Sequence, residues 1–184
     1  MTLNHNALTN SKVVVLLSGG IDSAACVNYY LSRGHDVSSL FVDYSQPSVG
    51  QESEAAAAVA KHYSISLHCL TVSGCVVSKG YVRARNAMLL TTALMNFRHR
   101  SGIISLGIHA GTPYTDCSPE FVQGMQQIFD LYEHGRVRID APFIEWTKLD
   151  IWSYAKAQNV PLHLTHSNNL DSLRPAADYL RTAG

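Results

Sequence analysis

The stretch Lys12-Val13-Val14-Val15-Leu16-Leu17-Ser18-Gly19-Gly20-Ile21-Asp22-Ser23 decides how this chain folds. After Lys12 come three apolar, β-branched valines, as in a strand buried within a parallel sheet. The residues that follow, 24–31, read as a helix. A turn of serine and glycine between a strand and a helix gathers backbone N–H groups at the positive end of a helix dipole. Such a turn favours an anion, most often a phosphate.

The side chains of this turn fit the same interpretation. Gly19 and Gly20 let the backbone turn sharply and approach a ligand without a Cβ in the way. Ser18 and Ser23 add hydroxyl donors. The structural alternative is an ordinary turn in which Asp22 or Ser23 caps the helix. Because Ser-Gly-Gly-x-Asp-Ser is far more specific than a Gly-Gly pair, we expect a phosphate site.

This string resembles the signature of the ATP pyrophosphatase, or PP-loop, family. The resemblance implies that ATP is cleaved between its α- and β-phosphates, with Mg²⁺ compensating the phosphate charge. It further implies that the loop holds the pyrophosphate through Ser18, Gly19, Gly20, Ile21, Asp22 and Ser23. The Gly-Lys-Ser/Thr ending of a P-loop is missing from the string, so transfer of the γ-phosphate is disfavoured.

The composition predicts one globular domain over residues 1–184. Hydrophobic residues make up 46% and charged residues 15%, which suits one well-buried core. Lys+Arg and Asp+Glu both total 14, so no long-range attraction to nucleic acid or to an anionic membrane is expected. Near-neutrality leaves a homodimer open. Residues 1–6 lack the features of a signal peptide, and the four cysteines show no CxxC spacing, so we expect a cytoplasmic protein.

The order of the expected elements predicts an α/β fold. Strands and helices alternate, which favours a Rossmann-like (HUP-type) parallel sheet with helices on both faces. The core is expected over about 12–160, followed by a tail at 161–184. The helix at 85–100 is the most apolar and should be buried. We expect strands at 12–15, 37–42, 65–72, 103–108 and 137–139, and helices at 24–31, 51–62, 85–100, 121–132 and 148–158.

Ligands of such sheets bind beyond the carboxyl ends of the strands. The loops at Ser18, Tyr44, Arg85 and His109 should therefore converge. Arginines at the start of a helix oppose its dipole, so Arg85 hints at an anionic partner such as a triphosphate or an adenylate. Lys148, near another helix start, could reach a phosphate as a point charge.

Further motifs are Asp43-Tyr44-x-Gln46 with Glu52, Arg85-Asn86, Tyr114-x-Asp116-Cys117 with Pro119-Glu120-Phe121, Pro142 and Lys148. Together with the loop at 18–23, they resemble the 7-cyano-7-deazaguanine synthase family over about residues 12–165. The resemblance implies two adenylations: ammonia first converts the carboxylate of 7-carboxy-7-deazaguanine into an amide, and dehydration then gives the nitrile. The implied catalytic residues are Ser18, Asp22, Ser23, Arg85 and Lys148; nucleotide contacts add Asp43, Gln46 and Asn86; acceptor contacts are Tyr44, His109, Tyr114, Asp116 and Cys117.

Two departures from the family pattern affect these expectations. Enzymes of this family carry a zinc-binding cysteine cluster just after a Thr-x-Ser, but Thr165-His166-Ser167 is followed here by residues without a cysteine. We therefore expect no metal ligands and no bound zinc, since tetrahedral zinc needs four soft or imidazole ligands. In addition, Gly111-Thr112-Pro113 stands where many members carry an acidic residue.

Three functions remain open from the sequence. The leading one is an amide or nitrile synthase that acts on a carboxylated deazapurine, with ammonia as the nitrogen source. The second is a PP-loop enzyme that adenylates a different carboxylate. The third is an ATP-binding accessory protein without turnover, against which the intact loop speaks. A sulfur-transfer role on tRNA is less expected, because there is neither a CxxC pair nor a basic surface.

Overall fold

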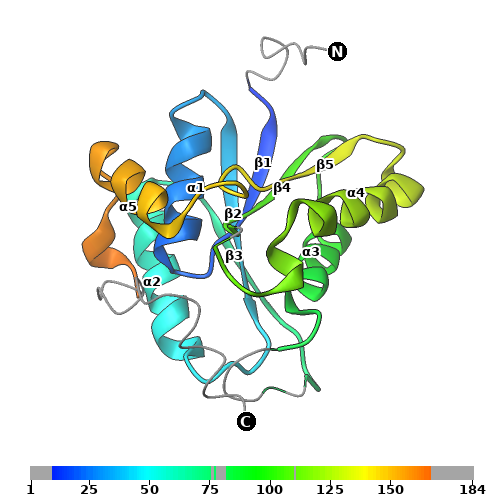
Figure 1. Ribbon diagram of the computed structural model, residues 1–184, viewed down its shortest axis with the longest axis horizontal. Helices are drawn as coiled ribbons and strands as arrows, with labels where there is room; N and C mark the ends of the chain where they lie inside the picture. The colour runs from blue at the N-terminus through cyan, green and yellow to red at the C-terminus, as the bar shows by residue number, and fades with distance from the viewer. Residues whose placement is uncertain (1–9, 76, 78–81, 110, 167–184) are drawn as a thin grey trace.

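Five parallel strands form the centre of the protein. The computed structural model describes residues 10–75, 77, 82–109 and 111–166 (Figure 1). The sheet has the order β3-β2-β1-β4-β5, and every neighbouring pair is parallel. Its strands are β1 (Lys12–Leu16), β2 (Asp36–Asp43), β3 (Leu67–Thr71), β4 (Gly102–Leu106) and β5 (Val137–Asp140). The predicted Rossmann-like α/β fold class is thus confirmed.

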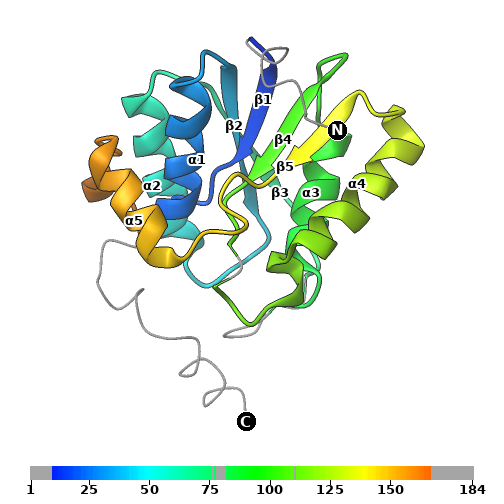
Figure 2. The ribbon, with the colours of Figure 1, turned by 45° about the horizontal axis from the view of Figure 1, so that its top comes forward.

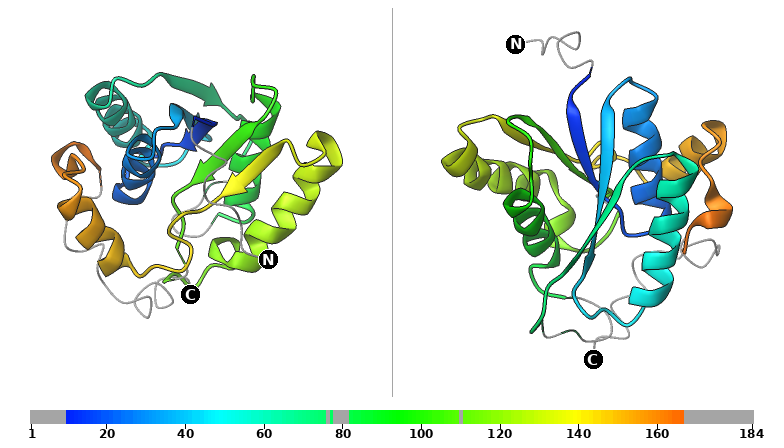
Figure 3. Two further views of the ribbon diagram at one scale, coloured as in Figure 1. Left: turned by 90° about the horizontal axis from the view of Figure 1, so that it is seen from above. Right: turned by 180° about the vertical axis from the view of Figure 1, so that it is seen from behind.

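Helices cover both faces of this sheet. Figures 2 and 3 show α1, α2 and α5 on one face and α3 and α4 on the other. The helices are α1 (Ile21–Leu31), α2 (Val49–His62), α3 (Arg85–Met95), α4 (Pro119–Glu133) and α5 (Lys148–Ala157), with short 3-10 turns η1 (Thr115–Cys117) and η2 (Leu162–Leu164). Within the described ranges, no helix is long and apolar enough to cross a membrane.

Alternating strand residues supply the two apolar cores. Val13 and Val15 of β1 point toward the first face and pack with Val27, Val59 and Ile151 from its helices. Leu16, Ile104 and Leu106 join the second core, with Leu90, Met125 and Phe129 from α3 and α4. Because successive strand side chains point to opposite faces, one β-branched run can feed both cores.

The predicted helix at 85–100 ends earlier than expected. In the structure α3 stops at Met95, and the side chain of Asn96 donates to the Thr92 carbonyl oxygen at 2.9 Å. The remaining residues are needed to turn the chain into β4, where the Gly102 N–H donates to the Arg136 carbonyl oxygen at 3.0 Å. The expected burial is also only partial, because Met95 is 81% exposed.

The strand order places a switch point at β1. The chain first moves outward from β1 to β2 and β3, and then returns to the other side of β1 at β4. Ligands of open parallel sheets bind at such a switch point, beyond the carboxyl ends of the strands. Ser18 lies two residues beyond the end of β1, and Gly107 directly follows β4.

Candidate active site

Residues 17–20 join β1 to α1, and together with the first turn of α1 they form the predicted phosphate loop, which is held by close backbone packing. Gly19 has φ +80°, in the left-handed region, and a Cβ there would lie 2.5 Å from the Glu52 carbonyl oxygen. Gly107 faces the loop from β4, where a Cβ would lie 2.7 Å from the carbonyl carbon of Asp22 and 2.8 Å from the Ser23 nitrogen. Glycine at both positions lets three segments meet.

The start of α1 differs from the capped turn that the sequence left as an alternative. The N-cap residue is Gly20, so no capping hydrogen bond from an N-cap side chain is made at the start of α1. Asp22 and Ser23 lie inside the first turn. The Ser23 hydroxyl donates to the Gly20 carbonyl oxygen at 2.9 Å, and the hydroxyls of Ser18 and Ser23 are 3.2 Å apart. The loop thus ends in the first turn of α1, a position that would suit an anion.

A cation from the far end of the chain reaches this loop. Lys148, the first residue of α5, places its Nζ 2.7 and 2.8 Å from the two carboxylate oxygens of Asp22. Its helix start is fixed by a capping box between Thr147 and Asp150. Both side chains of the pair are 21% exposed, so solvent reaches the pair only in part.

His109 stands beside this ion pair. It is buried, and its Nδ1 accepts a hydrogen bond from the Gly111 N–H at 3.1 Å. Burial lowers the pKa of His109; the Asp22 carboxylate acts in the opposite direction, and the Lys148 ammonium lowers the pKa further. With Nδ1 accepting, the neutral ring carries its proton on Nε2. His109 therefore fits a neutral hydrogen-bond donor.

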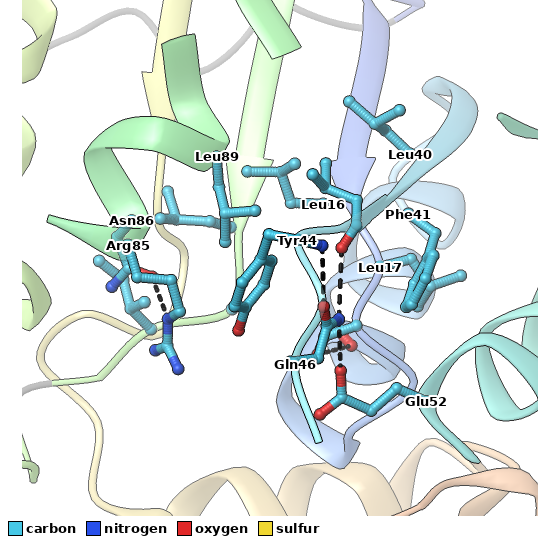
Figure 4. A pocket seen from close by; sticks show the side chains of 16 residues that line it. Leu16, Leu17, Leu40, Phe41, Tyr44, Gln46, Glu52, Arg85, Asn86 and Leu89 are labelled. Atoms are coloured by element: carbon cyan, nitrogen blue, oxygen red, sulfur yellow. Dashed lines mark hydrogen bonds between the residues drawn. The ribbon is translucent and has the colours of Figure 1, made fainter. Parts of the chain in front are cut away.

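The loop after β2 forms one wall of the pocket. Gln46 is buried, and both ends of its side-chain amide are hydrogen-bonded within this wall. Oε1 accepts from the Tyr44 N–H at 2.9 Å, and Nε2 donates to a carboxylate oxygen of Glu52 at 2.9 Å. The Ser48 hydroxyl donates to the other Glu52 oxygen at 2.6 Å. Figure 4 shows the Tyr44 ring between Arg85 and Gln46. Burial raises the pKa of the Tyr44 hydroxyl, and the nearby Arg85 guanidinium opposes this shift.

The opposite wall is the start of α3. Arg85 Nε donates to Asn86 Oδ1 at 3.3 Å, and Asn86 Nδ2 donates to the Asp116 carbonyl oxygen at 2.8 Å. The Asn86 N–H donates to a carboxylate oxygen of Asp116 at 3.3 Å. Burial raises the pKa of the neighbouring Cys117 thiol, which accepts from Asn86 Nδ2 at 3.6 Å.

Most of the predicted site residues gather at this edge of the sheet. One pocket is lined by Ser18, Ser23, Tyr44, Gln46, Arg85 and Asn86. Asp22, Lys148 and His109 form the adjoining cluster, and Asp116 and Cys117 are joined to the pocket through Asn86. Asp43 accepts from the Ser45 N–H at 2.8 Å, and the Tyr114 carbonyl oxygen accepts from the Cys117 N–H at 3.1 Å. The roles assigned to these residues remain predictions.

The sequence interpretation missed the apolar part of the pocket. Leu16, Leu40 and Leu106 line it from β1, β2 and β4, and Leu89 lines it from α3. Their place at or near strand ends is a signal that could have found the first three. Among the described residues no group of three or more His, Cys, Asp or Glu could hold a metal ion. The expected lack of zinc stays a prediction.

The fold and the site define a class of protein: a PP-loop type α/β domain with its phosphate loop at the switch point of a parallel sheet. A family model described as "Queuosine biosynthesis protein QueC" matches residues 12–78 and 73–172. The chain belongs to this family of enzymes, as the sequence resemblance predicted.

Curated relatives agree with this assignment. The 7-cyano-7-deazaguanine synthase of Methanoculleus marisnigri is 33% identical, over 85% of this chain and 83% of the relative. The enzyme of the same name from Acetivibrio thermocellus is 31% identical, over 84% and 82% of the two chains.

Solved structures support the fold. The U34-tRNA thiolase NcsA from Methanococcus maripaludis matches with a TM-score of 0.60 and 15% identity, over 91% of this chain and 63% of that chain. A predicted subunit of tRNA methyltransferase from Methanocaldococcus jannaschii matches with a TM-score of 0.58 and 15% identity, over 79% and 74%. At this identity the likeness concerns the fold alone.

Proposed function

We propose that this protein adenylates the carboxylate of a 7-carboxy-7-deazaguanine-like acceptor with ATP and that ammonia then displaces AMP. One observation carries the proposal: the loop at Ser18–Ser23, the cations Arg85 and Lys148, and the buried carboxylate of Asp116 converge at one edge of the sheet. Such a reaction requires hydrogen-bond donors for the phosphates, cations that offset their charge, and a hydrogen-bonding partner for a flat base.

The first half-reaction joins the two substrates. A carboxylate oxygen of the acceptor attacks the α-phosphorus, and the bond to the β-phosphate breaks, which gives an acyl adenylate and pyrophosphate. The N–H groups at the start of α1 suit the departing pyrophosphate. We assign the charge on the α-phosphate to Arg85, which lines the pocket, and the charge on the pyrophosphate to Lys148, which contacts Asp22 of the loop.

The second half-reaction forms the C–N bond. Ammonia attacks the acyl carbon, AMP leaves, and a proton is released, which gives the amide. A second ATP then adenylates the amide oxygen and releases pyrophosphate, and loss of AMP together with the two N–H protons of the amide gives the nitrile. His109 suits a neutral donor to a developing oxyanion in these steps. It does not suit a general base at Nε2, because its Nδ1 already accepts the Gly111 N–H.

Acceptor recognition is assigned to Asp116. One of its oxygens accepts from the Asn86 N–H, and we assign the other to the amino and ring N–H groups of the deazaguanine. A site that buries such a partner discriminates against ligands that leave it unpaired. Mg²⁺ would enter with ATP and offset the charge of its phosphates, and Asp22 is the carboxylate within the loop that would help to hold it.

Exchange of labelled pyrophosphate into ATP tests this function without ammonia. We expect exchange with 7-carboxy-7-deazaguanine and none with 7-deazaguanine, which lacks the carboxylate. Exchange with another carboxylate alone would overturn the assigned acceptor and keep the adenylation. Formation of ADP would overturn the chemistry. Tight ATP binding without exchange for any carboxylate would indicate the accessory role.

A further inference from the structure

The amide of Asn86 bridges the two halves of the site. Its Oδ1 accepts from Arg85 Nε at 3.3 Å, and its Nδ2 donates to the Asp116 carbonyl oxygen at 2.8 Å and contacts Cys117 Sγ at 3.6 Å. Asn86 is 3% exposed, so water cannot replace these partners freely. Every polar atom of the side chain is thus used inside the protein.

The two ends of this bridge belong to different parts of the site. Arg85 is assigned to the nucleotide, and it lines the pocket together with Leu89. Asp116 and Cys117 belong to η1, which leads into α4 and carries the residue assigned to the acceptor. The Asn86 N–H also holds the Asp116 carboxylate, so backbone and side chain of one residue fix both the turn and its carboxylate.

We propose that Asn86 is a positioning residue that couples nucleotide binding to acceptor binding. When a phosphate draws the Arg85 guanidinium into place, the Asn86 amide is held by its Oδ1, and its Nδ2 holds the turn at 115–117 in the shape that receives the acceptor. This role rests on the proposed function and differs from the direct nucleotide contact that the sequence predicted. We expect ATP to bind before the acceptor, or the acceptor to bind more tightly when ATP is present.

Two variants of Asn86 separate the bridge from general stability. Asn86→Leu removes both hydrogen bonds of the side chain. Asn86→Asp keeps an oxygen that can accept from Arg85 Nε but loses the Nδ2 donor to the Asp116 carbonyl oxygen. Gln126→Leu is the matched control. Gln126 also uses both amide ends, donating to the Val137 carbonyl oxygen at 3.1 Å and accepting from the Ile139 N–H at 2.7 Å, but it ties α4 to β5.

The first measurement is the affinity for 7-carboxy-7-deazaguanine with and without α,β-methylene-ATP, by calorimetry. In the natural protein the nucleotide should tighten acceptor binding by about 5- to 10-fold, within the usual range of such coupling. Both Asn86 variants should lose this factor while Gln126→Leu keeps it. Coupling that survives in Asn86→Asp would overturn the proposal, and that variant decides alone if Asn86→Leu does not fold.

The second measurement does not depend on the acceptor. Cys117 is buried in the turn, whereas Cys69 is exposed and serves as an internal reference for alkylation followed by peptide mass spectrometry. The nucleotide analogue should slow alkylation of Cys117 in the natural protein and in Gln126→Leu but not in the Asn86 variants. If the natural protein shows no such protection, the bridge is refuted. If protection is seen but no deazaguanine binds, the bridge stands and the proposed acceptor fails.

Discussion

Lys148 contacts both carboxylate oxygens of Asp22, at 2.7 and 2.8 Å, although 126 residues separate them in the chain. Because Asp22 lies in the first turn of α1 and Lys148 opens α5, the pair ties the predicted phosphate loop to α5. The ammonium group is thereby held at the loop, and for the proposed phosphate this would reduce the cost of ordering the group at the moment of binding.

Loss of this cation should therefore reduce both stability and turnover. For Lys148→Met we expect a loss of about 1–3 kcal/mol in unfolding free energy, between the values typical of exposed and of fully buried pairs. The matched control is Lys12→Met, which breaks the exposed pair with Asp36 and should cost less than about 1 kcal/mol. Urea unfolding and pyrophosphate exchange measure the two effects. Equal stability losses, or exchange unaffected in Lys148→Met, would contradict this role.

The glycine of the phosphate loop should be far less tolerant than a glycine of similar backbone shape. Gly19 and Gly34 have φ +80° and +77°, but only at Gly19 would a Cβ meet neighbouring atoms, with the Glu52 oxygen at 2.5 Å. Gly34→Ala should cost only the left-handed strain, about 1–2 kcal/mol. Gly19→Ala should add displacement of the loop and weaken ATP binding by more than about 10-fold, or about 1.4 kcal/mol. Equal ATP affinity of the two variants in calorimetry would refute this.

Stability should depend on the protonation of His109. Burial lowers the pKa of His109 in the folded protein, whereas the unfolded chain keeps the usual histidine pKa of about 6.5. Between these two pKa values the unfolded chain binds more protons than the folded protein. Stability should accordingly fall as the pH drops below about 7, and this fall should be smaller in His109→Gln. Urea unfolding midpoints across this range provide the measurement. An unchanged pH dependence in the variant would show that His109 is not the group responsible.

The segment after η2 should support the phosphate loop through its backbone. The His166 N–H donates to the Gly19 carbonyl oxygen at 2.9 Å. Thr165 has φ −88° and ψ 147°, a conformation that tolerates a following proline. His166→Pro should weaken ATP binding because it removes the N–H, whereas His166→Ala keeps the donor and should bind ATP normally. A loss in both variants would assign the effect to the imidazole instead.

The fold and the edge that carries the site could be predicted from local patterns. β-Branched runs such as Val13 to Val15 specify strands, and parallel strands bring the loops at their carboxyl ends together. The partner of Lys148 could not be predicted, because no sequence spacing encodes a contact over 126 residues. The hydrogen-bond partners of the Gln46 and Asn86 side chains could not be predicted from the sequence either. Amide side chains accept and donate equally well, and only packing decides which partners they meet.

Transfer of oxygen from the acceptor to AMP is the most direct test of the proposed chemistry. The experiment uses 7-carboxy-7-deazaguanine with oxygen-18 in both carboxylate positions, together with ATP and ammonia, and mass spectrometry of the nucleotide products. Adenylation of the carboxylate, and then of the amide, should place one oxygen-18 in each AMP formed, leave pyrophosphate unlabelled, and give a nitrile without label. Unlabelled AMP, or ADP as the product, would contradict the account.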